Sequence, residues 1–252
     1  MAAWASIWVF TSYRPPGQKS KDPVSTSESK FVELVRNWLV SLPHDTKTAF
    51  DALDDENLPR EARELAVGTI IYIVSPHDII SDRNDAIVSF VDDAILLRLG
   101  LAKMTAAAGE DGADFRGRYP ELFDSLEADW AICRGVLGDL AGWLEAKVAT
   151  LKTIDYKGKK IAKFLDDSDS REQLFEDGLV FRTDYPVDEK YIADRLKKAS
   201  TIVDALRRAN STAVSSRSDR FFARCTSIGS RPKLSGSHRM WFTLTRMSHT
   251  GK

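Results

Sequence analysis

Cysteine is scarce in this chain of 252 residues. Its two cysteines, Cys133 and Cys225, lie far apart in the sequence, and neither belongs to a CxxC pair. This spacing excludes a disulfide framework and a zinc site built on paired thiolates. Low cysteine usage is typical of proteins from reducing compartments, so we expect a cytoplasmic protein.

The sequence also lacks the motifs that mark common catalytic sites. It has no Gly-rich phosphate loop, no GxSxG, no HExxH and no paired Cys–His signature. The dipeptide His77-Asp78 resembles the HD pair of metal-dependent phosphohydrolases, but His44 is the one histidine upstream that could join it. One dipeptide with one partner does not make a metal centre, so these observations favour a non-enzymatic role.

Long apolar runs are missing as well. The first thirteen residues, MAAWASIWVFTSY, carry no charge, but they lack the basic start of a signal peptide. They are also shorter than the roughly 20 residues that span a bilayer. We therefore expect a soluble protein with a loose or docked N-terminus.

Charge is distributed unevenly along the chain. Residues 1–24 carry three basic side chains and one acidic, residues 25–210 carry 25 basic and 35 acidic, and residues 211–252 carry eight basic and one acidic. Nucleic-acid binding needs clustered Lys and Arg, so we expect no specific nucleic acid to bind the acidic body. The basic tail offers a contact to an anionic membrane surface.

Apolar residues recur at three- and four-residue steps through most of the chain, which predicts a mainly α-helical bundle. We expect it to be built on an antiparallel helical hairpin, with a smaller helical C-terminal annex and disordered termini. The predicted division is a flexible segment 1–26, a helical core 27–152 containing the hairpin 59–104, an annex 153–210 and a disordered basic tail 211–252.

The pattern predicts where individual helices begin and end. Pro43 is expected to end the first helix, and the stretch AAAGEDGAD to close the second arm of the hairpin. A small β-hairpin is expected around Asp177 and Gly178. The predicted helices cover residues 27–42, 45–53, 59–74, 86–104, 120–150 and about 187–206.

Three glycines share one face of the predicted helix 120–150. Glycine inside a helix costs roughly 1 kcal/mol relative to alanine, so the stripe requires a reason. Close packing of another helix of the same chain is one, and self-association through Gly135, Gly138 and Gly142 is the other.

Acidic residues cluster at the corner of the hairpin, in SPHDIISDRND. Ser75, Pro76 and Asp78 have the form of a capping box, with Pro at the first helical position and an acid two residues later. Asp82 and Asp85 repeat this pattern before the next helix. The sequence therefore predicts that Ser75, Pro76, Asp78, Asp82 and Asp85 are structural caps.

Asp92 and Asp93 are expected in the middle of the apolar helix 86–104. A buried carboxylate must be ion-paired, hydrogen-bonded or metal-bound, because an isolated charge is costly to desolvate. Three arrangements follow. They are an ion pair with Arg60, Arg63 or Arg83; hydrogen bonds from backbone amides of the corner; or a divalent ion held by Asp78, Asp82 and Asp92 or Asp93, for which oxygen ligands favour Mg²⁺, Mn²⁺ or Ca²⁺.

Residues 59–104 resemble the YkvA-like domain, a family of unknown function found widely in bacteria. The resemblance implies a helical hairpin around an Asp-containing corner, and it implies no reaction, cofactor or substrate. Ile79, Ser81 and Ser89 depart from the family pattern. The matching residues are Tyr72, Ser75, Pro76, Asp78, Ile80, Asp82, Asp92 and Asp93.

These observations favour a structural or protein-interaction module, with an unknown protein partner, whose Asp corner fixes two helices. One alternative is a divalent-metal-binding protein or metal-dependent hydrolase that uses Asp78, Asp82, Asp92 and Asp93 as ligands. A second alternative is a peripheral membrane adaptor that uses the basic tail.

Overall fold

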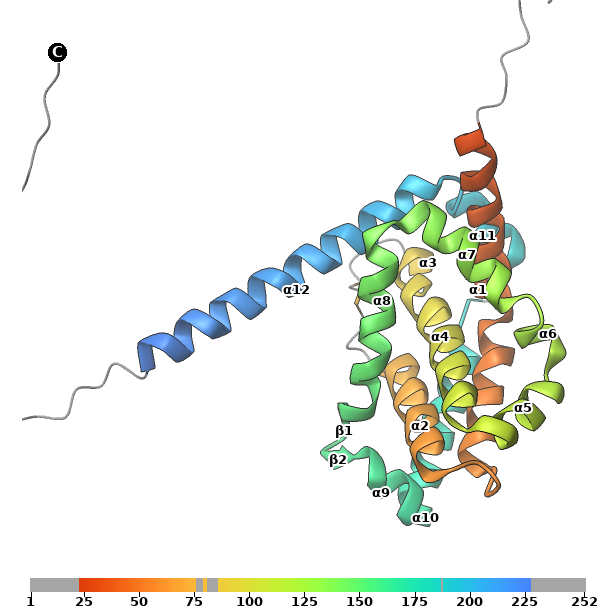
Figure 1. The fold of residues 1–252 in the computed structure, drawn as a ribbon, viewed down its shortest axis with the longest axis vertical. Coiled ribbons are helices and arrows are strands. Elements are labelled where there is room, and N and C mark those ends of the chain that lie inside the picture. The colour runs from red at the N-terminus through yellow and green to blue at the C-terminus, as the bar shows by residue number, and fades with distance from the viewer. Residues whose placement is uncertain (1–22, 76–78, 81–85, 187, 228–252) are drawn as a thin grey trace, which may run out of the picture. The chain divides into compact units, whose positions relative to one another are not determined.

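A computed structural model describes residues 23–75, 79–80, 86–186 and 188–227. It confirms the mainly α-helical bundle (Figure 1). Described residues up to Thr212 belong to one compact unit, and those from Ala213 to a second. The elements are α1 (Pro23–Asp54), α2 (Arg60–Val74), α3 (Ala86–Ser89), α4 (Val91–Ala107), α5 (Gly109–Gly117), α6 (Pro120–Phe123), α7 (Leu126–Leu137), α8 (Asp139–Thr150), the 3-10 turn η1 (Leu151–Thr153), β1 (Asp155–Tyr156), β2 (Lys159–Lys160), α9 (Ile161–Asp166), α10 (Ser168–Asp184), α11 (Glu189–Arg195) and α12 (Ala199–Ser227).

Helix α1 continues through Pro43, so the predicted stop at that residue is wrong. Proline has no N–H, and position 43 therefore cannot bond to the carbonyl of Leu39 as a helix requires. The hydroxyl of Tyr185 donates to that carbonyl at 2.8 Å. A tertiary hydrogen bond thus replaces the missing helical one, and the two helices predicted for this segment are one.

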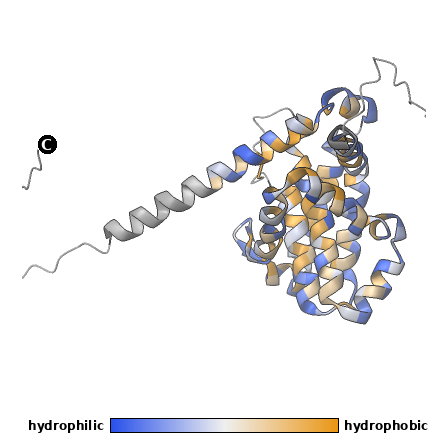
Figure 2. Ribbon diagram, turned by 45° about the horizontal axis from the view of Figure 1, so that its top comes forward, coloured by the Kyte–Doolittle hydropathy of each residue, from blue (hydrophilic) through white to orange (hydrophobic). Residues whose placement is uncertain are grey.

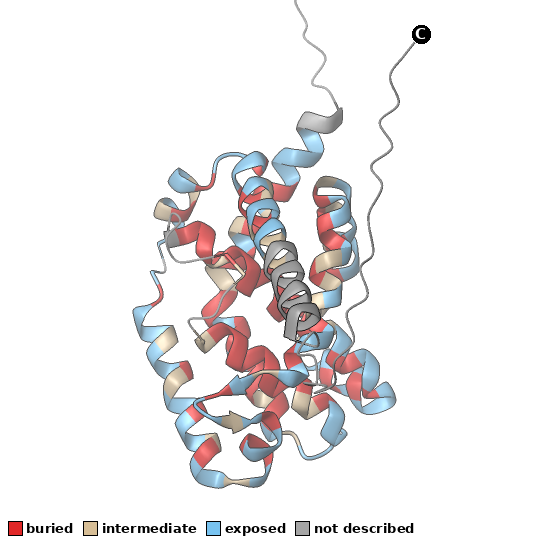
Figure 3. Cartoon of the chain, turned by 90° about the vertical axis from the view of Figure 1, so that its left-hand side faces the viewer, coloured by how far each residue is buried: buried red, intermediate tan, exposed pale blue. Residues whose placement is uncertain are grey.

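Helices α2 and α4 pack against each other in opposite directions and form the predicted hairpin. Figure 1 shows α4 between α8 and α1, which both contact it. Apolar residues dominate these central helices in Figure 2, and Figure 3 shows that most of them are buried. The apolar runs of the sequence therefore form the centre of the bundle, as their period predicts.

The second arm of the hairpin is not one helix, because Phe90 separates α3 from α4. Phe90 has ψ near 0° and its N–H bonds to Ile87 at 3.3 Å, which makes a turn. The turn brings the Phe90 ring within 4.8 Å of the Tyr185 ring, measured between centroids. Asp92 and Asp93 consequently lie in the first turn of α4, and their expected mid-helix position is wrong.

The segment after α4 also differs from expectation. Residues from Gly109 onward form α5, where a closing loop is predicted. The predicted helix 120–150 is three helices, and Gly138 makes the break between α7 and α8 with φ of +56°. That backbone conformation strongly favours glycine, since a Cβ would clash there. Gly138 therefore serves a turn, which explains its place in an otherwise helical pattern.

The expected packing of another helix on the glycine stripe is wrong within the described residues. Apart from the adjoining backbone of its own segment, a Cβ built at Gly135, Gly138 or Gly142 would meet no atom within 4 Å. The break at Gly138 also removes the single continuous face that the stripe needs. Self-association through these positions is a separate question that the single chain does not test, and it stays a prediction.

The β-hairpin is at 155–160 rather than around Asp177 and Gly178, which lie inside α10. Lys157 and Gly158 both have positive φ, as a two-residue type I′ turn requires. Gly178 faces α1, where a Cβ would stand 2.5 Å from the ring of Phe50. Only glycine permits this close seating of α10 on α1.

The annex helices also attach to α1. The guanidinium of Arg36 donates to the carbonyls of Leu196 at 2.7 Å and Ala193 at 3.0 Å, where α11 ends. A cation at a helix C-terminus is favourable because the last carbonyls lack partners. The one helix predicted after Pro186 is two, α11 and α12, and α12 continues past residue 210 to Ser227. Of the predicted flexible ends, residues 1–22 and 228–252 lie outside the described part, whereas residues 23–26 belong to α1 and residues 211–227 to α12, where no helix was predicted.

A buried ion pair joins α1 to α4. The Arg98 guanidinium donates to the Asp45 carboxylate at 2.6 Å and to the Ser41 hydroxyl at 3.0 Å, and it lies 4.9 Å from the Trp38 ring centroid. Desolvation lowers the pKa of Arg98, and the Asp45 charge opposes that shift. The pair is satisfied within the bundle, and it fixes the register of the two helices.

Candidate functional site

Asp92 is the best-defined member of the acidic corner. Its side chain is fully buried, and the Oδ2 atom accepts hydrogen bonds from the backbone N–H of Ile79 at 2.9 Å and of Ile80 at 3.3 Å. The Tyr72 hydroxyl donates a short hydrogen bond to the same atom, and it accepts from the Ile79 N–H at 2.9 Å. Asp92 therefore joins the end of α2, the corner and the start of α4.

Burial dominates the electrostatics of this corner. Desolvation raises the pKa of Asp92 from 3.8 to about 6, against the lowering effect of its hydrogen bonds, the largest from Tyr72. Desolvation and the charges of Asp92 and Asp93 raise the pKa of Tyr72 well above its usual value, so its hydroxyl stays protonated as a donor. Asp93 is buried next to Asp92. The pKa of Tyr185 is also raised, mainly by desolvation and secondly by the charge of Asp93.

The predicted amide-bonded arrangement is what the described residues show for Asp92. The predicted ion pairs with Arg60 and Arg63 are wrong. Arg60 binds Asp166 at 2.7 Å and Arg63 donates to the Leu53 carbonyl at 2.9 Å. Arg83 lies outside the described residues.

Of the residues predicted as structural caps, only Ser75 is among those that the structure describes. Ser75 stands at the C-cap of α2 with extended backbone, and Ile79 and Ile80 form a bend. The other predicted caps lie outside the described residues, as does His77; they are Pro76, Asp78, Asp82 and Asp85.

The predicted metal centre cannot be assembled from the described residues. Within them no group of three or more His, Cys, Asp or Glu side chains is placed to hold an ion. Two of the four predicted ligands, Asp78 and Asp82, lie outside them, while Asp92 and Asp93 are neighbours in α4. Binding of Mg²⁺, Mn²⁺ or Ca²⁺ stays a prediction.

Tyr72 is the member of the corner that sequence reasoning missed as a functional group. Nothing in the helical period shows that its hydroxyl reaches Asp92, 20 positions later. The signal was its place at the end of a helix that is otherwise apolar, where a buried hydroxyl requires a partner.

A second feature is an apolar surface on α10, which we call the α10 surface. Its members are Phe175, Leu179 and Val180, which are 48%, 48% and 58% exposed. Glu172 and Glu176 lie among them on the exposed side of the helix, and neither has an ion-pair partner among the residues described. The α10 surface is therefore apolar with acidic neighbours.

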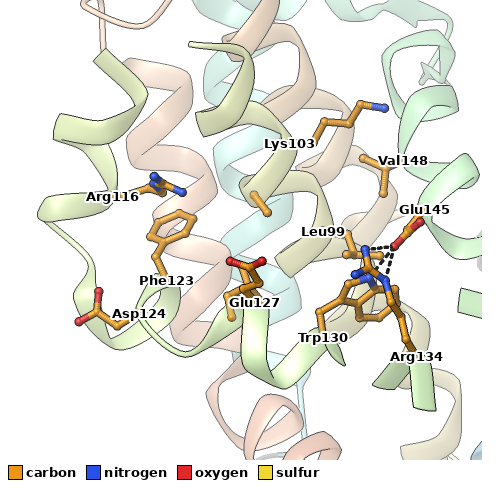
Figure 4. Close-up of a pocket in the computed structure, with 12 residues that line it drawn as sticks. Leu99, Lys103, Arg116, Phe123, Asp124, Glu127, Trp130, Arg134, Glu145 and Val148 are labelled. Carbon is orange, nitrogen blue, oxygen red and sulfur yellow. Dashed lines mark hydrogen bonds and ion pairs between the residues drawn. The ribbon is translucent and has the colours of Figure 1, made fainter. Parts of the chain in front are cut away.

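A third feature is a cleft of about 470 Å³ bordered by α4 to α8 (Figure 4). Apolar side chains from α4, α6, α7 and α8 line it, and charged side chains surround them. The sequence contains no motif for this cleft, because its lining comes from separate helices. The break at Gly138 allows α7 and α8 to contribute to the same lining. Its residues are Leu99, Ala102, Lys103, Arg116, Phe123, Asp124, Leu126, Glu127, Trp130, Arg134, Glu145 and Val148.

Together these features define a helical-bundle protein with a buried Asp–Tyr corner, an apolar surface and a cleft. Comparison with protein-family profiles, curated proteins and solved structures finds no match for this chain. Within the described residues no helix is both long and apolar enough to cross a bilayer.

Proposed function

We propose that this chain is a non-enzymatic protein-interaction module that binds an amphipathic, basic-flanked helix of a partner protein through the α10 surface. The observation that carries the proposal is the exposure of Phe175, Leu179 and Val180 within two turns of one helix. Single exposed apolar residues are normal, whereas several large ones close together are typical of an interaction site.

The charges of the α10 surface indicate the chemistry of the partner. Glu172 and Glu176 form no ion pair with a described residue, and residues 25–210 carry ten more acidic than basic groups. A partner with Lys or Arg flanking its apolar stripe would pair with both carboxylates and would be steered toward the acidic body. An acidic partner would be repelled.

The α10 surface is held ready for binding. Asp167 caps the start of α10 by accepting from the Ser170 N–H at 3.0 Å. Gly178 lies against Phe50, and the Phe175 ring packs edge-on at 5.4 Å from the same ring. Because the helix is formed and seated before binding, its ordering cost is already met, which favours affinity.

The test is a titration with two synthetic helical peptides that share one apolar stripe and differ in their flanks, one lysine-rich and one glutamate-rich. Burial of a half-exposed leucine stabilises a complex by about 1 kcal/mol, so Leu179→Ser should weaken the lysine-flanked peptide roughly five- to tenfold. Fluorescence anisotropy of a labelled peptide measures this change.

Charge reversal supplies the matched control. The variant Glu172→Lys with Glu176→Lys should reverse the preference between the two peptides. The variant Glu121→Lys with Asp139→Lys changes the net charge equally at exposed positions on α6 and α8, and should leave the preference intact. Equal binding of both peptides to the unmodified chain, or no effect of Leu179→Ser, would refute the proposal.

The two alternatives rest largely on residues outside the described part. Metal chemistry would require Asp78 and Asp82, and the membrane role would require the basic tail. Both stay predictions.

A further inference from the structure

The cleft between α4 and α7 has the size and composition of a small-molecule site. Its volume of about 470 Å³ falls within the range that such sites occupy. Leu99 of α4 and Phe123 of α6 are half-buried in its lining, while Trp130 of α7 and Val148 of α8 are buried. These four side chains provide an apolar wall that an aliphatic or aromatic group can cover.

One end of the cleft is closed by groups that satisfy each other. Glu145 accepts from the Trp130 indole N–H at 2.6 Å and from Arg134 at 3.0 and 2.7 Å (Figure 4). Hydrogen bonds from Trp130 and then Arg134 lower the pKa of Glu145, so it stays ionised and paired. This end holds the walls in place, and all three hydrogen bonds use the Oε1 atom of Glu145.

Outside that end, the charged residues of the lining form no ion pair with a described residue; they are the cations Lys103 and Arg116 and the anions Asp124 and Glu127. In Figure 4 Arg116 of α5 and Glu127 of α7 point toward the same hollow from different sides. Neither forms an ion pair with any residue that the structure describes. Lys103 and Asp124, the remaining charged residues of the lining, point away from Glu127 in this view.

A ligand with charge of one sign satisfies only part of this arrangement. An anion would pair with Arg116 but leave Glu127 without a partner. A cation would pair with Glu127 but leave Arg116 without a partner. A neutral apolar molecule would desolvate both groups without replacing their contacts with water, which is unfavourable. A zwitterion with an apolar body satisfies the carboxylate, the guanidinium and the apolar wall at once.

We infer that the cleft binds a short zwitterionic peptide with apolar side chains, its ammonium group on Glu127 and its carboxylate on Arg116. The side chains lie against Leu99, Phe123 and Val148. This site lies on α4 to α8 and involves no residue of the α10 surface, so it is independent of the partner proposed above.

The experiment uses the full chain and three dipeptides with free ends: phenylalanyl-leucine, leucyl-phenylalanine and leucyl-leucine. Each is compared with its N-acetylated and its C-amidated form, which remove one charge at a time. Calorimetry gives the dissociation constants, and the indole N–H resonance of Trp130 reports whether binding is in the cleft. Loss of one charge contact should weaken binding about tenfold.

Two variants connect each ligand charge to its residue. N-acetylation of the dipeptide should weaken its binding to the unmodified chain, but it should weaken binding to Glu127→Gln little further. C-amidation of the dipeptide should weaken its binding to the unmodified chain, but it should weaken binding to Arg116→Gln little further. Glu121→Gln and Arg182→Gln, exposed charges outside the cleft lining, are the matched controls and should bind all forms as the unmodified chain does.

The inference is overturned if none of the three dipeptides saturates the chain below about 10 mM, or if capped and free forms bind equally. It is also overturned if binding leaves the Trp130 resonance unchanged, or if the variants and their controls respond alike.

Discussion

Replacing Asp92 with asparagine should change how the stability of the protein depends on pH. Burial raises the pKa of this carboxyl from 3.8 to about 6. Each pKa unit corresponds to about 1.4 kcal/mol, so ionised Asp92 costs the folded state roughly 3 kcal/mol relative to the protonated form. The pKa of Asp92 is higher in the folded state than in the unfolded state. The protonated carboxyl therefore contributes its full stabilisation below pH 3.8, and this contribution is lost as the pH rises through about 6.

Asparagine keeps the shape of the side chain and has no proton to lose. Its carbonyl oxygen can accept from the Tyr72 hydroxyl and from the Ile79 and Ile80 amides, as Oδ2 does. Its NH₂ group would occupy the place of Oδ1, which has no hydrogen-bond partner among the residues described. That mismatch costs about 1–3 kcal/mol at every pH, so the informative quantity is the change with pH.

The assay is urea unfolding followed by tryptophan fluorescence at pH 4.5 and pH 7.5. The free energy of unfolding of Asp92→Asn, minus that of the unmodified chain, should rise by about 2 kcal/mol from the lower pH to the higher. Asp111→Asn, at an exposed position on α5, should show no such rise. A difference that stays flat within about 0.5 kcal/mol, or falls, would refute the raised pKa.

Three further results are expected. In a double-mutant cycle, Tyr185→Phe should destabilise the chain by about 1 kcal/mol or more, and by less when Pro43→Ala restores the helical N–H; equal losses in both backgrounds would contradict the replacement of that bond. Gly178→Ala should lower the unfolding free energy by about 1–3 kcal/mol, and Phe50→Leu should reduce that penalty, whereas strict additivity would show that the two do not touch. If the acidic corner holds a metal, Mg²⁺, Mn²⁺ or Ca²⁺ should raise the melting temperature of the unmodified chain and EDTA should reverse it, with no response in Asp92→Asn; a melting temperature that ignores metals and chelator eliminates the site.

The central helices were predicted from long apolar segments with a charged lead-in at Arg60–Glu64, because α2 and α4 are buried on most sides. The helical period failed at boundaries that depend on contacts distant in sequence. Pro43 is tolerated because Tyr185 reaches the Leu39 carbonyl, and no local pattern contains that contact. Gly138 was interpreted as a helix-packing position. Glycine is equally typical of a turn with positive φ, and the structure shows such a turn at Gly138.

The site was predicted to a similar extent. Asp92 could be recognised as a buried carboxylate that needs partners, since no basic residue lies one turn away on its helix. Its actual partners, Tyr72 and the amides of the corner, come from an earlier helix and a bend whose geometry the sequence does not encode locally. The α10 surface was missed because Phe175 and Leu179 belong to a segment that is apolar on more than one side, which weakens its period.

The hydrogen bond between Tyr185 and Leu39 also has a consequence for synthesis. Its two residues are 146 positions apart, so the first helix leaves the ribosome long before its missing partner exists. At about 5–20 residues per second, that interval is roughly 7–30 s. During this time the Leu39 carbonyl of α1 lacks its partner and the apolar face of α1 is uncovered, and chaperones that bind nascent helices would meet it in that state.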